Sequence, residues 1–389
     1  MLSSLVSTLI FSLLFSRVNF INHKDQTNTQ TISLDDSSLT GLVVNTELKI
    51  ATFNLFNYLE PPNAAYEFER ILSAEQWQKK QRWISEYLRE YQPDIIGFQE
   101  VFSPDALKEL VASQGYKYFA VVDQPKIIDD FIYQRPVVAI ASRFPIVEVI
   151  AVEPSIELAQ TLGLTSNFSF NRKVLRATID IPHLGNCDCY VVHFKSKRSM
   201  IELDEKNNNW SPEQTIIESL KAQIAGSWGS TVQRGSEATL LMMEMIQRRE
   251  ETNQPMVLMG DFNNTLADGV LSHLLTNTLR FVSTIDRDAY LAKYCLNDAW
   301  DLFQAVLSHE YTEVNEVKAA RTPTHYFGAG SSVLDYILLS CEFDANYHDS
   351  LYEVSAHETY DRHLINPIFE RDGESTDHGI VLVTLTLRS

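Results

Sequence analysis

The chain has 389 residues, of which 44% are hydrophobic and 21% are charged, a composition typical of a globular protein with a sizeable core. Its 51 acidic and 32 basic residues give a net charge of −19, which disfavours nonspecific binding to DNA or to an anionic membrane. An anionic substrate is not excluded, because a bound divalent ion and a few local cations can reverse the field inside a cleft.

Residues 1–21 are predicted to be a signal peptide or an anchor. The run Met1–Phe15 is mostly apolar, about the length of a secretory h-region and short for a membrane span. No Lys or Arg precedes the run and no A-x-A site follows it, so an uncleaved anchor or a misassigned start stays open. A signal would make the protein secreted or periplasmic; without one we expect it in the cytoplasm. The polar residues 22–46 are predicted to be a linker, and 47–389 a single domain.

Within this domain, short apolar runs predict many strands and few regular crossovers. Helices are predicted over 74–91, from the start signal Ser103-Pro104-Asp105, from Ser211-Pro212, and over 237–249. The strands are predicted at 48–53, 94–98, 136–141, 145–152, 174–181, 189–194, 256–260, 333–339 and 380–387. The order indicates two packed sheets with helices outside and is too irregular for a (β/α)₈ barrel. The segments 195–235 and 262–330 are interpreted as long connections, which tend to be functional or inserted.

The four cysteines form no CxxC pair, which argues against a structural zinc site. We expect small buried residues, and leave open whether any of them pair.

Polar residues suited to metal or phosphate chemistry follow several of the predicted strands. One such residue is usually a turn former or a structural side chain. The set is more informative, because strand ends on packed sheets are rigid and can converge on one rim. Its members are Asn54, Glu100, His193, Asp261, Asn263, Asp335, Asp377 and His378.

The residue types in this set are chemically consistent with each other. The oxygen ligands of Glu100, Asn54 and Asp377 suit Mg²⁺, Mn²⁺ or Ca²⁺. A carboxylate such as Asp335 beside His378 would fix the tautomer of the imidazole and stabilise its charged form. A second carboxylate, Asp261, next to an amide donor is what hydrolysis of an unreactive ester needs.

The motifs, in order, resemble the endonuclease/exonuclease/phosphatase superfamily, whose fold is that of deoxyribonuclease I. They are TFN at 52–54, QE at 99–100, VVHF at 191–194, GDFN at 260–263, LDYIL at 334–338 and TDHG at 376–379. The variants LFN at 55–57 and VHFKSKR at 192–198 are similar to a bacterial branch described as exported. The resemblance implies an α/β fold: a four-layer α/β sandwich, two packed mixed β-sheets flanked by helices, with Mg²⁺ as cofactor and Mn²⁺ or Ca²⁺ as alternatives.

The resemblance also implies roles for the residues. Asn54 and Glu100 would bind the metal, and Asp377 would be a third ligand or would support His378. The catalytic group would comprise Asp261, which activates water; Asn263, which holds the phosphate or that water; His193 and His378, which flank the phosphate; and Asp335, which orients a histidine. Phe56 stands where some relatives carry a carboxylate, and Asn57 is the candidate to compensate. Thr376 replaces the commoner Ser and keeps the hydroxyl.

The candidates for contact with phosphate are Asn57, Arg176 and Lys195. Lys195 belongs to a local cluster with Lys197 and Arg198 in an otherwise acidic chain, although a solvated turn explains that cluster equally well. The alternative for Arg176 is that its side chain snorkels at the edge of the core and makes no contact with phosphate.

Two interpretations are open for the roles of several other polar residues. Gln233, Arg234 and Glu237 either line the cleft or pair on a helix surface. Tyr326, next to His325, either stacks on a base or packs locally.

Three functions compete on this sequence. The first is a Mg²⁺-dependent nuclease or phosphodiesterase, and the second is a phosphatase or a phospholipase C-type hydrolase of sphingomyelin or inositol phosphate. A non-enzymatic binding module is the third, which the complete polar set disfavours. A nuclease groove should show cations and aromatics, whereas a lipid enzyme should show an exposed apolar loop beside the cleft. The expected partner is nucleic acid or another phosphodiester, with no obligate protein partner and no stable membrane association beyond the N-terminal segment.

Overall fold

A computed structural model describes residues 46–388, apart from 67–70, 129, 202, 204–209, 276–290 and 311–319. The signal segment and almost all of the linker lie outside the described residues, so the domain boundaries at 21 and 46 stay predictions.

Two six-stranded sheets form the centre of the molecule. The first runs β16 (Tyr352–Tyr360), β17 (Ile380–Leu387), β1 (Glu47–Tyr58), β3 (Ile95–Val101), β7 (Val137–Ser142) and β4 (Tyr118–Val121). The second runs β12 (Asn297–Asp298), β15 (Asp335–Leu339), β11 (Met256–Asp261), β10 (Gly185–His193), β9 (Val174–Ile181) and β8 (Ile146–Val152). Each sheet is mixed, because β1 is parallel to β3 and β10 is parallel to β11, while the other neighbours are antiparallel.

Two smaller groups of strands complete the β structure. They are the hairpin β13 (His325–Phe327) and β14 (Gly330–Ser332), and the three short strands β2 (Ala64–Ala65), β5 (Lys126–Ile128) and β6 (Ile132–Gln134). These strands are too short to be recognised from an apolar run.

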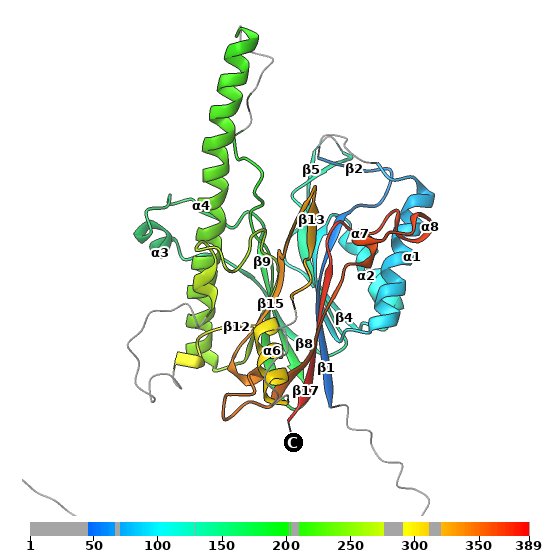
Figure 1. The fold of residues 1–389 in the computed structure, drawn as a ribbon, viewed down its shortest axis with the longest axis vertical. Coiled ribbons are helices and arrows are strands. Elements are labelled where there is room, and N and C mark those ends of the chain that lie inside the picture. The colour runs from blue at the N-terminus through cyan, green and yellow to red at the C-terminus, as the bar shows by residue number, and fades with distance from the viewer. Residues whose placement is uncertain are drawn as a thin grey trace, which may run out of the picture. The chain divides into compact units, whose positions relative to one another are not determined.

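Helices cover the outer faces of both sheets (Figure 1). They are α1 (Ala74–Tyr91), α2 (Pro104–Ser113), α7 (Arg362–Ile365) and α8 (Phe369–Asp372) on one side, α3 (Ile156–Thr161) and α4 (Pro212–Thr252) on the other, with α6 (Ala299–Glu310) near one end. Single 3₁₀ turns lie at Ser272–Leu274 and Cys341–Phe343.

Three apolar clusters lie between these layers. One fills the space between the sheets with residues such as Ile50 and Met259. The second packs the first sheet against α1 and α2, and the third packs the second sheet against α4. The predicted four-layer α/β sandwich is therefore confirmed.

Local signals explain where the predicted helices begin. Ser73 and Ser211 each form a capping box with the Gln three residues later, at the starts of α1 and α4. Ser103 precedes α2 but makes no capping bond; its hydroxyl accepts from the Glu60 N–H instead. Within α1, the predicted buried face is confirmed, including Trp77 and Ile84.

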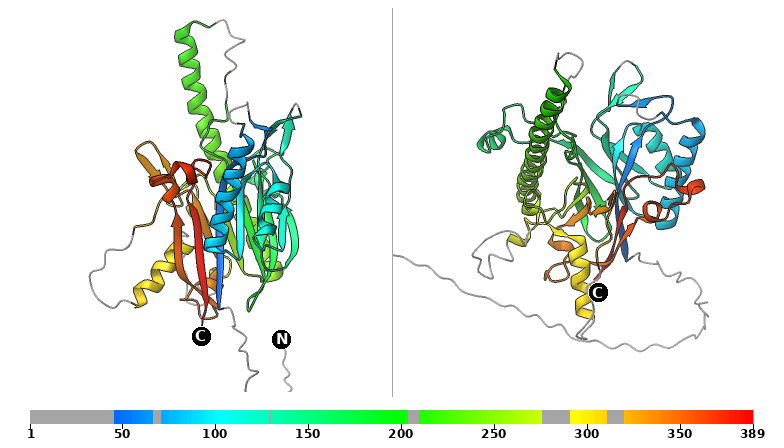
Figure 2. Two further views of the ribbon diagram at one scale, coloured as in Figure 1. Left: turned by 90° about the vertical axis from the view of Figure 1, so that its right-hand side faces the viewer. Right: turned by 45° about the horizontal axis from the view of Figure 1, so that its top comes forward.

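The prediction for α4 is wrong in its extent. The separate start at Ser211 and the helix over 237–249 belong to one helix of 41 residues, Pro212–Thr252. The segment 195–235, interpreted as a long connection, is therefore part of this helix from residue 212 onward. The N-terminal half of α4 stands clear of the sandwich (Figure 2). No described sheet packs against this half, so its sequence lacks the periodicity relative to a core by which a helix that covers a sheet is recognised.

All four cysteines are buried and free, as the expectation of small apolar residues required. No helix among the described residues combines the length and the apolar character that crossing a bilayer requires.

The register of the second sheet aligns three predicted site residues. His193, at the end of β10, is paired with Asp261 at the end of β11, and Asp261 is paired with Asp335 at the start of β15. Gly260 allows β10 and β11 to approach each other closely at this point. A Cβ at Gly260 would lie 2.0 Å from the Val192 carbonyl oxygen, and the φ of Gly260 is +149°.

We predict that Gly260→Ala lowers the free energy of unfolding by about 2 kcal/mol or more, from the combined backbone strain and overpacking. Urea denaturation followed by circular dichroism measures the change. Gly269→Ala is the matched control, since a Cβ there meets no atom within 4 Å. Equal unfolding midpoints for the two variants would contradict the close approach at Gly260.

Candidate active site

A cleft of about 380 Å³ opens at the ends of the central strands. Eight of the eleven predicted site residues line it: Asn57, Glu100, His193, Lys195, Asp261, Asn263, Asp377 and His378. Asn54 and Asp335 are buried and bonded to residues of that wall. Only Arg176 lies elsewhere. The convergence expected from the strand ends is therefore present in the fold.

Asp261 is the most connected of these residues. Its carboxylate accepts from the Asn263 backbone N–H at 2.8 Å and from the Asn263 and Asn54 amides at 3.1 and 3.3 Å. Burial raises the pKa of Asp261 to about 7; the His378 imidazole opposes this rise, and the Asp335 and Glu100 carboxylates add to it. A carboxylate with a pKa near neutrality can exchange a proton at physiological pH.

Asp335 and His378 form the predicted carboxylate–imidazole pair. The distance from His378 Nδ1 to Asp335 Oδ2 is 2.8 Å, and both side chains are buried. Burial alone would lower the pKa of His378, but the Asp335 and Asp261 carboxylates outweigh it and hold this pKa well above its ordinary value. His378 therefore carries a proton, with Nδ1 occupied and Nε2 left for other partners. The Thr376 hydroxyl accepts from the His378 N–H and donates to the Asn54 carbonyl, which explains why Thr serves here as well as Ser.

The second histidine has the opposite state. Burial, followed by the positive charges of Arg172 and His378, holds the pKa of His193 well below its ordinary value. Its Nε2 lies 3.3 Å from Asp261 Oδ2, while its Nδ1 is buried without a partner in the described structure. A neutral His193 can thus donate to Asp261 and orient it.

Glu100 and Asp377 fit a divalent cation. Both carboxylates line the cleft; burial raises the pKa of Asp377, and the charge of Glu100 raises it further. Glu100 Oε2 accepts from the Asn57 N–H at 2.9 Å, and the buried Asn57 Oδ1 has no donor in the described structure. Two like charges beside an unpaired amide oxygen suit a hard cation.

The side chain of Asn54 contacts two carboxylates and a backbone N–H, whereas a metal ligand would direct its oxygen at the ion. Its Nδ2 faces Glu100 and Asp261, at 3.5 and 3.3 Å, and its Oδ1 accepts from the Phe56 N–H. In this orientation the amide holds two carboxylates in place, and its role as a metal ligand stays a prediction.

The proposed phosphate contact of Arg176 does not fit the fold. Arg176 pairs with Glu148 and lies near Asp188, on the face of β9 opposite to the core residues Leu175 and Ala177. The alternation of the strand places its side chain away from the rim. The prediction chose the arginine inside the strand, whereas only residues before the strand can reach the cleft.

Arg172, which lies just before the same strand, lines the cleft. Because β9 is antiparallel to β10, the residues before β9 lie next to the end of β10. Arg172 Nη1 accordingly lies 3.4 and 3.5 Å from the carbonyl oxygens of His193 and Phe194. Arg135 and Tyr66 also line the cleft and were missed; the signal for Arg172 was its place directly before a predicted strand.

Residues of α4 hold the cleft wall from behind. Glu237 accepts from the backbone N–H groups of Asn171 and Lys195, at 2.7 and 2.8 Å, and Arg234 donates to the Lys195 carbonyl. The Lys195 ammonium donates to the Arg198 carbonyl at 2.9 Å, so it also stabilises its own loop. Arg234 and Glu237 were expected either to line the cleft or to pair on a helix surface. Neither interpretation was complete, because both side chains position the residues that line the cleft.

The hairpin residues His325 and Tyr326 differ in role. The Tyr326 hydroxyl donates to Asp361 at 2.6 Å, which favours the local packing alternative. The His325 ring lies beside His378, with ring centroids 5.2 Å apart.

A family model described as the endonuclease/exonuclease/phosphatase family matches residues 51–342. The chain belongs to this family. The match covers the cleft residues up to Asn263 and the buried Asp335, while Asp377 and His378 lie beyond it. The search of curated proteins finds no match.

Similar solved structures share little sequence with this family member. The human nocturnin catalytic domain with a bound sulfate anion has 16% identity and a TM-score of 0.51, covering 88% of this chain and 95% of that one. An endonuclease/exonuclease/phosphatase from Beutenbergia cavernae DSM 12333 has 16% identity and a TM-score of 0.46, covering 88% and 72%. D. rerio TDP2 complexed with a single-strand DNA product has 12% identity and a TM-score of 0.47, covering 88% and 100%.

The two arginines provide a matched test of the cleft. We predict that Arg172→Ala lowers kcat/KM on a phosphodiester at least ~10-fold, the scale of a lost charge-assisted hydrogen bond, while Arg176→Ala changes it less than ~2-fold. Steady-state kinetics on bis(p-nitrophenyl) phosphate measures both. A larger loss for Arg176→Ala than for Arg172→Ala would contradict the assignment.

Proposed function

We propose that this protein is a metal-dependent phosphodiesterase that hydrolyses nucleic acid by in-line attack of water on phosphorus. The observation that carries the proposal is the single cleft in which Asp261, the protonated His378 and the acidic pair Glu100 and Asp377 face one volume. Hydrolysis of an unreactive ester needs a base, a positive charge for the phosphoryl oxygens and a proton for the leaving oxygen.

The chain's own residues divide these tasks. Asp261, oriented by His193 and Asn263, takes the proton of the attacking water. His378, held by Asp335 through Nδ1, offers the proton on Nε2 to the leaving oxygen. Arg172 binds a nonbridging phosphate oxygen at the cleft wall.

Glu100 and Asp377 would hold Mg²⁺, or Mn²⁺ or Ca²⁺ in its place, with Asn57 Oδ1 as a further oxygen ligand. When bound, the ion would supply charge neutralisation for the developing phosphorane.

Two features favour nucleic acid as the substrate. Four cations line the cleft of a chain with net charge −19: Arg135, Arg172, Lys195 and Arg198. A second cavity of about 160 Å³ shares Arg135, Pro136, Asn171 and Arg172 with the cleft. The shared arginines suit a second phosphate next to the scissile one, which a polynucleotide provides.

A specific observation supports lipid hydrolysis as the second candidate. Every fourth residue along the protruding half of α4 is an exposed apolar one, namely Ile216, Leu220, Ile224, Trp228 and Val232. An exposed apolar element near the cleft is what an enzyme acting on a lipid surface requires.

A substrate panel distinguishes the two candidates. With Mg²⁺, we expect the purified protein to cleave plasmid DNA or RNA and bis(p-nitrophenyl) phosphate, and to leave sphingomyelin vesicles intact. EDTA should abolish turnover, and added Mg²⁺ or Mn²⁺ should restore it, because the carboxylate pair needs its cation. Cleavage of the lipid alone would establish the second candidate, and full activity in chelator would exclude the metal role.

Substitutions test the division of tasks. Asp261→Ala and His378→Ala should each lower kcat at least ~10²-fold, on the scale of lost acid–base or electrostatic catalysis. His348→Ala, which removes an exposed imidazole, should leave kcat unchanged. Near-wild-type turnover in either cleft variant would refute the assignment, provided that circular dichroism shows all three variants folded.

A further inference from the structure

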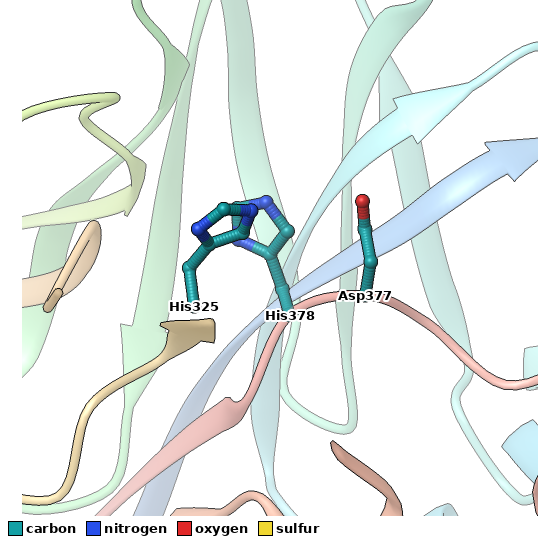
Figure 3. Close-up of side chains that lie close together, drawn as sticks. All are labelled: His325, Asp377 and His378. Atoms are coloured by element: carbon teal, nitrogen blue, oxygen red, sulfur yellow. The ribbon is translucent and has the colours of Figure 1, made fainter. Parts of the chain in front are cut away.

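A second group of metal-ligand side chains lies beside the proposed Mg²⁺ site. The candidate ligand atoms of His325, Asp377 and His378 all lie within 4.8 Å of one another. The two rings lie next to each other, with the Asp377 carboxylate at the side of His378 (Figure 3). An ion with four tetrahedral ligands and bonds of ~2.0–2.2 Å holds its ligand atoms ~3.5 Å from one another. Rotation of one imidazole or of the carboxylate would therefore close the site.

The hydrogen bond of His378 prepares it as a ligand. Its Nδ1 is bonded to Asp335 at 2.8 Å, so an ion binds at Nε2 and displaces the proton that this nitrogen otherwise carries. This carboxylate–histidine arrangement is how proteins fix the tautomer of a metal-binding imidazole. Asp261, Asp335 and His378 also lie close together, but there the Nδ1 proton already lies between His378 and Asp335.

The backbone fixes His325 at this position. Residues His325 and His378 form a β-bridge, and the Gly379 N–H donates to the Thr324 carbonyl at 2.6 Å. The approach depends on Gly379, because a Cβ there would lie 3.2 Å from Thr324 Cα. With Tyr326 bonded to Asp361, the residues on both sides of His325 are anchored. Rigid placement of this kind lowers the entropic cost of binding an ion.

We propose that His325, Asp377 and His378 form a second metal site, which selects an ion with affinity for nitrogen, such as Zn²⁺ or Co²⁺, over Mg²⁺. Two imidazoles and one carboxylate leave a fourth position open, and imidazole ligands suit Zn²⁺ and its neighbours, whereas Mg²⁺ takes oxygen. The inference goes beyond the proposed hydrolysis, because it concerns an ion that binds whether or not a substrate is cleaved. Because Asp377 and His378 also line the cleft, an ion bound here takes the place of the Nε2 proton that His378 would offer to a leaving oxygen.

Cobalt binding to the full chain tests the site without an activity assay. Purified apoprotein is titrated with Co²⁺ in excess Mg²⁺, and the visible d–d absorption bands report affinity and coordination number. We expect saturable bands of a four- or five-coordinate ion, with Kd raised at least ~10-fold in His325→Ala and His325→Gln. Even supporting residues of metal ligands are worth ~10–100-fold in affinity.

Two controls locate the ion. His348→Ala, at an exposed histidine beside Asp349, should bind Co²⁺ like the wild type. Glu100→Gln, which changes the oxygen-rich site, should keep the bands. The imidazole of His325 plays no part in the backbone bridge, so both His325 variants should unfold at the wild-type temperature without metal. Wild-type affinity in His325→Ala, absence of the bands in the wild type, or their loss in Glu100→Gln would overturn the proposal, whatever the substrate panel gives.

Discussion

The hydrogen bond between Asp335 and His378 joins the two sheets at the rim of the cleft. Asp335 starts β15 in one sheet, and His378 lies two residues before β17 in the other. Both side chains are buried, so each depends on the other to offset the loss of water. Removing one partner of such a buried pair costs about 3–5 kcal/mol, because an uncompensated charge remains. Closure of the sandwich and assembly of the active site therefore depend on the same contact, and Asn54 repeats the pattern by bonding across the sheets to Asp261.

Backbone geometry near the ends of the strands completes the site. Phe56, Asn57, Glu100 and Asn263 all have positive φ, between 50° and 60°. Such conformations cost of order 1–3 kcal/mol each and persist only where the surroundings impose them. The hydrogen bonds that impose them are within the site, from the Asn57 N–H to Glu100 and from the Asn263 N–H to Asp261. The chain thus turns sharply where each strand ends, and the site itself holds the turns in place.

The features that could be predicted from the sequence are those in which burial in the core restricts the choice of residues. Buried strands such as 174–181 and 380–387 were found at their observed bounds, because a mainly apolar run of strand length allows few alternatives. The polar residues near the ends of other buried strands were found for the same reason. Arg172, in contrast, reaches the cleft only because β9 is antiparallel to β10, and His325 only because Thr324 lies against Gly379. Strand order and contacts between distant segments carry no local pattern in a single sequence.

In the proposed function, the choice of substrate depends on groups outside the proposed catalytic residues. A base, an imidazolium and a carboxylate pair can act on any phosphodiester, so they do not distinguish a polynucleotide from a lipid. The distinguishing elements are the arginines of the cleft wall and α4. The inner face of this helix fixes the wall through Arg234 and Glu237, and its protruding half exposes the apolar series that begins at Ile216. Because one helix carries both features, a surface that engages the apolar series would lie in fixed register with the proposed phosphate-binding wall, and we expect the chemistry of that surface to select the ester that enters.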